Sequence, residues 1–133
     1  MDNKNIIKDI IETFELYDDW TDKYEYIIEL GKKLTPMPEA LKTEHSVVKG
    51  CQSKVWLVAQ KNDDIVTFFA DSDAIITKGI IGLLLEVFNN QAIETIKNTN
   101  LSFIEQIGLK EHLSPNRSNG LSAMIKTIQT IAD

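Results

Sequence analysis

Cysteine is almost absent from this chain of 133 residues, which contains Cys51 and no second thiol. An intramolecular disulfide is therefore impossible, and so is a zinc site built on several cysteines. Arginine is equally scarce: Arg117 is the only one, and Lys and Arg together number 14 against 20 Asp and Glu. The resulting net charge of −6 argues against a nucleic-acid or anionic-membrane binder, because both need a clustered basic face.

Long apolar stretches are missing as well. The most apolar segment, residues 75–88, contains Lys78 and Glu86 and is shorter than the ~20 residues that a membrane-spanning helix requires. We interpret it as a buried core helix. The first residues form no unbroken apolar targeting segment. Together with the free thiol, these features predict a cytoplasmic protein without a membrane partner.

The length and composition are those of one folded domain. Hydrophobic residues make up 43% and charged residues 26% of the chain, which is ordinary for a globular protein. A length near the ~100–200 residues of a typical domain, without repeat, low-complexity tract or linker, predicts a single domain over residues 1–133. A chain of this size does not need a metal to fold.

The N-terminal third has the spacing of two helices. The first is predicted over residues 3–16, where apolar residues recur at helical intervals: Ile7, Ile10, Ile11 and Phe14. Asp18 or Asp19 can cap the second helix, and Gly31 can end it. Two prolines then predict a loop over residues 35–45.

The pattern next changes to the alternation of strands. Residues 46–48, 55–60 and 65–70 are strand candidates, and residues 61–64 have the composition of a turn. A tight connection is expected at residues 50–52. These features predict a meander of about three antiparallel strands.

The apolar segment that follows begins behind three residues suited to helix capping. Residues 71–73 read Asp-Ser-Asp and are expected to cap a helix over residues 75–88. Gly79 and Gly82 lie on one face of that helix. Each lowers helix propensity by up to ~1 kcal/mol relative to alanine, so we expect them to allow close packing against another element.

The remaining chain is predicted to be helical, with one polar interruption. Ser102 and Glu105 fit a capping box for a short helix that ends at Gly108. Residues 109–117 are expected to form a loop, and Ser118 to cap a final amphipathic helix. Helices before and after a small antiparallel sheet predict the α+β class.

Cys51 is the first candidate for chemistry. Its neighbours are polar, and Gly50 permits a positive φ and a sharp turn. Lys49 and Lys54 supply local positive charge that favours a thiolate. From the residues alone, a functional thiol and an inert buried cysteine are both open interpretations.

Other combinations of residues give weaker evidence for a catalytic or binding site. A Cys/His hydrolase could pair Cys51 with His45 or His112, but any chain with one cysteine and two histidines allows this pairing. No ligand spacing indicates a metal site. Arg117 is the single arginine in a chain whose other cationic side chains are lysines, and it fits either a planar multi-donor contact or an ordinary surface ion pair.

Four short motifs, in sequence order, resemble those of the SufE family. They are W-x-x-K-Y-x-Y-I-I-x-L-G at residues 20–31, G-C-Q-S-K-V-W at 50–56, D-S-D-A followed by K-G at 71–79, and H-L-S-P-N-R-S-N-G-L with a later Met at 112–124. Ser114 and Asn116 stand where the family more often has Thr and Ser, which are also small and polar. The resemblance covers residues 15–130.

The resemblance implies a sulfur acceptor. Cys51 would accept persulfide sulfur from a SufS-like cysteine desulfurase, stimulate that enzyme, and pass the sulfur to an iron–sulfur cluster scaffold complex. Pyridoxal phosphate belongs to the partner, so no cofactor or metal is expected in this chain. Contact or positioning roles are implied for Gly50, Gln52, Ser53, Asp73, His112 and Arg117. The implied fold is a compact α+β domain like that of U-type iron–sulfur scaffolds, with helices packed on a small curved antiparallel sheet.

Three alternatives remain open at this point. An iron–sulfur scaffold or metal-binding module needs about three or four protein ligands, usually thiolates. A non-catalytic desulfurase activator would keep its effect after replacement of Cys51. A thiol hydrolase would cleave an activated thioester.

Overall fold

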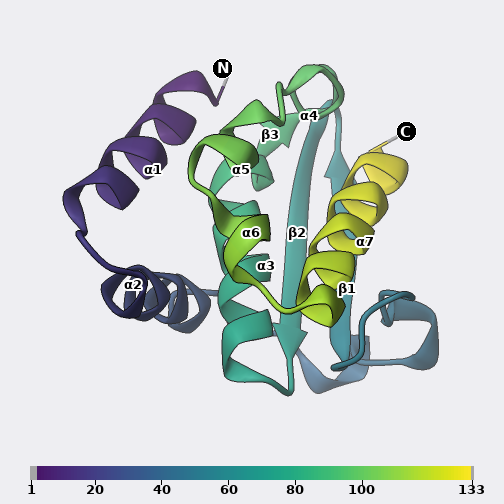
Figure 1. Ribbon diagram of the computed structural model, residues 1–133. Coiled ribbons are helices and arrows are strands. Elements are labelled where there is room, and N and C mark those ends of the chain that lie inside the picture. The colour runs from purple at the N-terminus through teal and green to yellow at the C-terminus, as the bar shows by residue number, and fades with distance from the viewer. Residues whose placement is uncertain (1–2, 133) are drawn as a thin grey trace.

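The computed structural model describes residues 3–132. Within that range, seven α-helices and three strands build one domain in which the α-helices of the N- and C-terminal halves lie on either side of the central helix α3 (Figure 1). This arrangement confirms the α+β prediction. The elements are α1 (Lys4–Leu16), α2 (Trp20–Lys32), β1 (Val55–Asn62), β2 (Ile65–Ser72), α3 (Ile75–Phe88), β3 (Gln91–Ala92), α4 (Ile93–Asn98), α5 (Ser102–Gln106), α6 (Leu109–His112) and α7 (Pro115–Ala132).

The sheet is antiparallel, in the order β1-β2-β3. β1 and β2 form a hairpin in which Val55 lies opposite Ser72, and Asp63 in the connecting turn has a left-handed φ of 57°. The predicted pair of strands is confirmed, but the predicted third strand at residues 46–48 is wrong. That segment makes one bridge, from Val47 to Trp56.

The third strand is β3, which pairs with the start of β2 through Val66 and Gln91. The predicted loop at residues 35–45 is interrupted by two short 3₁₀ helices, Glu39–Leu41 and Glu44–Ser46. Ser46 ends the second of these turns. It therefore cannot begin a strand.

Helix α3 forms the centre of the core. Ten of its 14 residues are buried, and apolar residues occupy most of its circumference, as in a helix that is largely enclosed by other elements. A Cβ at Gly79 would lie 2.5 Å from the carbonyl oxygen of Ile27 in α2, and one at Gly82 would lie 2.7 Å from that of Leu30. The prediction that these glycines allow close packing is confirmed.

Helix α2 begins as predicted and ends later. Asp19 is its N-cap, and its carboxylate accepts a hydrogen bond from the Asp22 N–H at 3.0 Å. Gly31 does not end the helix, which continues to Lys32. Gly31 instead faces α3, where a Cβ would lie 2.8 Å from the backbone nitrogen of Gly79. Packing, rather than termination, explains this glycine.

The predicted capping of the C-terminal helices is partly wrong. Leu101, not Ser102, precedes α5, and the structure records no side-chain cap there. The predicted loop at 109–117 contains helix α6. Ser118 is the predicted cap of the final helix, but α7 starts at Pro115, four residues before the start that such a cap implies, because proline is well suited to the first position of a helix. Ser114 performs the capping: its hydroxyl accepts a hydrogen bond from the Arg117 N–H at 3.3 Å.

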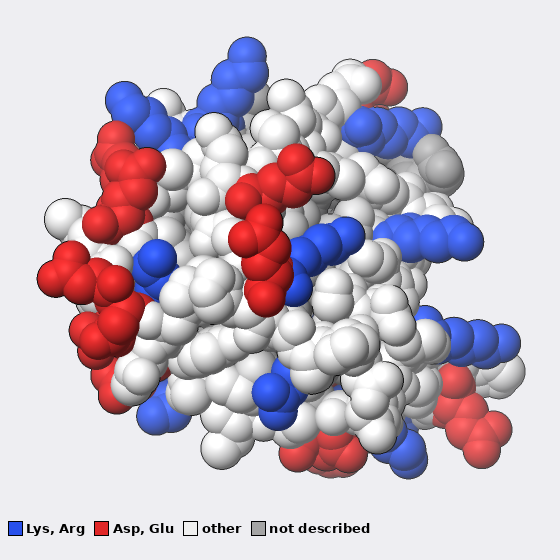
Figure 2. All heavy atoms as spheres, viewed as in Figure 1, with Lys and Arg blue, Asp and Glu red and all other residues white. Residues whose placement is uncertain are grey.

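The surface over α1 and α2 is acidic. Figure 2 shows acidic side chains gathered on the side of the molecule where these helices lie, away from α7. Eight acidic residues of α1, α2 and the turn between them are exposed: Asp9, Glu12, Glu15, Asp18, Asp19, Asp22, Glu25 and Glu29. Along residues 3–132, no helix combines the length and apolarity needed to cross a membrane.

Candidate functional site

The turn before β1 presses Cys51 against helix α7. Gly50 has a φ of +96°, a region that residues with a side chain rarely adopt. A Cβ at this position would also lie 3.2 Å from the Cβ of Ala123 in α7. The expected positive φ of Gly50 is confirmed, and both the conformation and the crowding require glycine.

The thiol of Cys51 is half-buried against the backbone of α7. It donates a hydrogen bond to the carbonyl oxygen of Gly120, with an S···O distance of 3.7 Å. Burial raises the pKa of this thiol above its ordinary value. The expectation that Lys49 and Lys54 favour the thiolate is not met, because both lysines are exposed and desolvation dominates. In this state Cys51 is a protonated, weakly nucleophilic thiol at neutral pH.

Cys51 lines a cavity of about 330 Å³ between its own loop, α3 and the start of α7. Most of the lining side chains can form hydrogen bonds, and one is cationic. The lining residues are Cys51, Gln52, Ser53, Thr77, Ile80, Ser114, Asn116, Arg117, Gly120 and Met124. Of the residues that the sequence singled out, the structure therefore brings Cys51, Gln52, Ser53 and Arg117 to one site, with Gly50 next to it.

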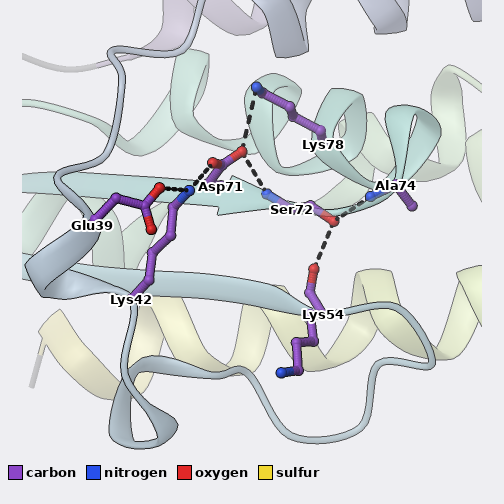
Figure 3. Close-up of polar contacts among 7 residues, drawn as sticks. All are labelled: Glu39, Lys42, Lys54, Asp71, Ser72, Ala74 and Lys78. Carbon is purple, nitrogen blue, oxygen red and sulfur yellow. Dashed lines mark hydrogen bonds and ion pairs between the residues drawn. The ribbon is translucent and has the colours of Figure 1, made fainter.

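Asp73 does not line this cavity. Its carboxylate accepts a hydrogen bond from the Lys54 N–H at 3.1 Å, and its own N–H donates to the Lys54 carbonyl oxygen at 3.3 Å. The Ser72 hydroxyl donates to the same carbonyl oxygen at 2.7 Å and accepts from the Ala74 N–H (Figure 3). Asp73 and Ser72 thus tie the end of β2 to the Cys51 loop.

Asp71 belongs to a different polar cluster, next to the hydrogen bonds that Asp73 and Ser72 make with Lys54. Its carboxylate pairs with Lys42 at 2.7 Å and with Lys78 at 3.3 Å (Figure 3). Burial opposes ionisation of this carboxyl, but hydrogen bonds from Lys42, the Ser72 N–H and Lys78 outweigh it and lower the pKa of Asp71. The prediction that residues 71–73 cap α3 is wrong, since Ala74 is the N-cap and no side chain accepts a capping hydrogen bond there.

His112 also lies outside the cavity lining. Its ring stacks on that of Trp20 with centroids 3.9 Å apart, and its Nδ1 lies 3.0 Å from the Gly108 carbonyl oxygen. Its own carbonyl oxygen accepts a hydrogen bond from the Tyr24 hydroxyl. These contacts fasten α6 to α2. A partner-binding role for His112 remains a prediction.

Sequence reasoning selected Arg117 but placed it in a loop, and it missed Gly120 and Met124 of the same helix as lining residues. Once Pro115 is recognised as the first residue of a helix, the spacing of Arg117, Gly120 and Met124 places them on one face. That signal was present in the sequence. No comparable local signal identifies Thr77 and Ile80 of α3, because packing of distant segments brings them to the cavity. Among residues 3–132, no three His, Cys, Asp or Glu side chains are grouped so that they could hold a metal ion.

Comparisons with known proteins agree on one family. The profile of the SufE domain, described as an Fe-S metabolism associated domain, matches residues 8–132. An uncharacterised SufE-like protein of Rhizobium meliloti is 42% identical over 129 residues, covering 93% of this chain and 92% of the relative. A second SufE-like protein, from Rhizobium etli, is 40% identical over 125 residues, covering 90% of this chain and 84% of the relative.

The fold has a solved counterpart. The solution structure of a hypothetical protein from Thermus thermophilus superposes with a TM-score of 0.80, covering 99% of this chain and 96% of the other at 23% identity. At that identity the likeness establishes the fold alone. The family match and the two relatives extend over nearly the whole chain and include the Cys51 loop. The chain therefore belongs to the SufE family, and its role lies in iron–sulfur metabolism.

Proposed function

We propose that this protein is a sulfur acceptor for a cysteine desulfurase. Cys51 takes persulfide sulfur from the desulfurase, and its removal stimulates that enzyme. The sulfur then passes to an iron–sulfur cluster scaffold. The observation that supports this most is the position of the chain's single thiol on a polar cavity within a SufE domain.

The transfer balances without any group that the chain lacks. The Cys51 thiolate attacks the outer sulfur of the desulfurase persulfide. A new S–S bond forms at Cys51, and the bond to the desulfurase cysteine breaks, releasing that cysteine as a thiolate. No external oxidant or reductant is consumed. Pyridoxal phosphate acts earlier, in the partner, when sulfur is removed from free cysteine.

The raised pKa of Cys51 makes the resting thiol a poor nucleophile. Docking of the desulfurase must therefore either move the loop, so that the thiol regains solvent, or supply a group that removes its proton. The loop is suited to movement. Besides the packing at Gly50, it is held by the thiol bond to Gly120 and by the bonds from Asp73 and Ser72 to Lys54.

The cavity supplies the space that the incoming sulfur needs. A second sulfur, bonded about 2.05 Å from Sγ on the line toward the Gly120 carbonyl oxygen, would stop about 1.7 Å short of an atom 3.7 Å away. That is far inside van der Waals contact. The outer sulfur must instead rotate into the cavity, where hydroxyl, amide and guanidinium groups can donate hydrogen bonds to a persulfide anion.

Intact-mass measurement after incubation with a cysteine desulfurase and cysteine tests the proposal. The chain should gain the mass of one sulfur atom, and a reductant should remove it. Cys51→Ser should fold normally and gain nothing, and prior alkylation of Cys51 should block the gain. Sulfur uptake by the alkylated chain would refute the role of this residue.

Two further readouts separate the alternative functions. Full stimulation of the desulfurase by Cys51→Ser would favour a non-catalytic activator. A stoichiometric visible chromophore after anaerobic cluster reconstitution would favour an iron–sulfur scaffold.

A further inference from the structure

Resting on the proposed function, we propose that the Cys51 cavity also binds small thiols that bear a carboxylate and transfers sulfur to them. Such a molecule would occupy the cavity with its carboxylate on Arg117 and its sulfur at the persulfide. This adds a low-molecular-weight acceptor class to the protein donor and the protein acceptor of the proposed function.

The first support is an exposed cation for which no side-chain partner is recorded within residues 3–132. Arg117 lines the cavity, and its backbone N–H bonds to Ser114. Within residues 3–132, its guanidinium has no recorded hydrogen bond or ion pair. No Asp or Glu lines the cavity. The nearby carboxylates are engaged elsewhere, Asp71 with two lysines and Asp73 with the Lys54 N–H. The cavity lining therefore carries one cationic side chain and no carboxylate, and a guanidinium is the side chain best shaped to bind a carboxylate through two bonds.

The second support is the size and lining of the space. About 330 Å³ lies at the lower end of the ~300–1,000 Å³ range of small-molecule sites. Two of the lining residues, Ile80 and Met124, offer apolar contact, and the rest are mostly hydroxyls and amides. A short thiol with one anionic end matches this combination, whereas a bulky or cationic thiol does not.

The chemistry requires no additional reagent. The acceptor thiolate attacks the outer sulfur of the Cys51 persulfide, and the S–S bond to Cys51 breaks. The electron pair of that bond leaves on Sγ, which regains the proton that the acceptor lost. The products are the Cys51 thiol and the persulfide of the small molecule. The Cys51 thiol is then available for another transfer.

The test bypasses the desulfurase, so that it is independent of the proposed function. Cys51 is loaded with inorganic polysulfide, the excess is removed, and the loss of one sulfur mass is followed with three thiols of similar length: 3-mercaptopropionate, 2-mercaptoethanol and cysteamine. Rates are compared per concentration of thiolate. The carboxylate thiol should saturate and react about tenfold faster than the neutral one, from a charge-assisted bond. The cationic thiol should be slowest, and propionate should compete with 3-mercaptopropionate.

Variants of the chain test whether Arg117 causes the faster reaction of the carboxylate thiol. Arg117→Ala should reduce the rate ratio of the carboxylate thiol to the neutral thiol to that of a free persulfide. Arg117→Lys should restore part of it, because the charge remains and the planar fork is lost. Lys61→Ala, which removes an exposed cation in the β1–β2 hairpin, should leave the ratio unchanged. Equal rates for all three thiols in the unmodified chain, or a preference that survives Arg117→Ala, would overturn the inference. A chain that failed to take sulfur from a desulfurase would instead overturn the proposed function.

Discussion

Replacing Gly120 with alanine should stabilise the fold while it impairs sulfur transfer. Gly120 lies inside α7, where alanine is favoured over glycine by up to ~1 kcal/mol. A Cβ at this position would meet Sγ of Cys51 at 3.5 Å and its Cβ at 3.9 Å, which are ordinary contacts that the resting thiol tolerates. The free energy of unfolding should therefore rise by about 0.5–1 kcal/mol, which corresponds to a Tm increase of roughly 2–5 °C in a domain of this size.

The methyl group of Gly120→Ala should destabilise the persulfide form of the protein. Its outer sulfur cannot point along the line to the Gly120 carbonyl oxygen, 3.7 Å from Sγ, so it needs the space that the new methyl group occupies in part. Overpacking of this kind costs about 1–3 kcal/mol. The persulfide form of Gly120→Ala should be disfavoured by roughly fivefold to a hundredfold relative to the unmodified chain.

Two measurements decide this prediction: thermal unfolding of the resting protein, and the fraction of Cys51 that carries sulfur at equilibrium with a desulfurase. Ser122→Ala is the matched control, because Ser122 is exposed on α7 and does not line the cavity. It should gain helix stability without any change in loading. Normal loading of Gly120→Ala would refute the argument that the second sulfur needs the space beside this residue.

Three further outcomes are expected. Ile75→Ser should weaken desulfurase binding about tenfold in a calorimetric titration without lowering Tm, since Ile75 is 69% exposed beside the Asp73 tie and burial of such a side chain stabilises an interface. Gly79→Ala should lower the free energy of unfolding by about 1–3 kcal/mol in urea denaturation, because its Cβ would meet α2 at 2.5 Å. Burial raises the pKa of the folded Cys51 thiol, so the unfolded chain loses this proton first. The free energy of unfolding of the unmodified chain, relative to that of Cys51→Ser, should be constant below the pKa of the unfolded thiol and should fall as pH rises through the pKa of the folded thiol. Iodoacetamide labelling of Cys51 in the folded chain should be shifted to higher pH.

Regular periodicity accounts for the parts of the fold that the sequence predicts well. Helices α1 and α3 and the β1–β2 hairpin each repeat their apolar spacing several times, so their type and approximate bounds follow from local pattern. The third strand has no such pattern, because Gln91–Ala92 contains two residues. It exists because the chain after α3 returns to the start of β2, which is a property of tertiary packing.

The hydrogen-bond partners of short polar side chains are the feature that the sequence predicts least well, for a physical reason. Asp and Ser side chains can cap a helix or bind any other nearby backbone group, and only the fold decides which donor is in reach. The sequence pattern favours Asp73 as a cap of α3, whereas in the structure Asp73 binds Lys54. The same pattern places Ser114 in a loop, whereas Ser114 caps α7. At the site, residue type predicted Cys51 and Gly50, whereas the burial that raises the thiol's pKa depends on the distant Gly120.

Under the proposed function, a half-buried Cys51 must become reactive when a partner docks, and the different packing of the core and of the Cys51 loop is compatible with this. The tightest packing is between α2 and α3, at Gly31, Gly79 and Gly82, and none of these residues lines the cavity. The Cys51 loop is held mainly by individual hydrogen bonds, each of which contributes only about 0.5–1.5 kcal/mol. A partner that replaces two or three of these bonds with its own can therefore release the thiol without disturbing the core. If the loop moves in this way, the proposed transfer predicts that the thiol regains water and that its pKa falls toward the ordinary value, so that the nucleophile forms only where a sulfur donor is bound.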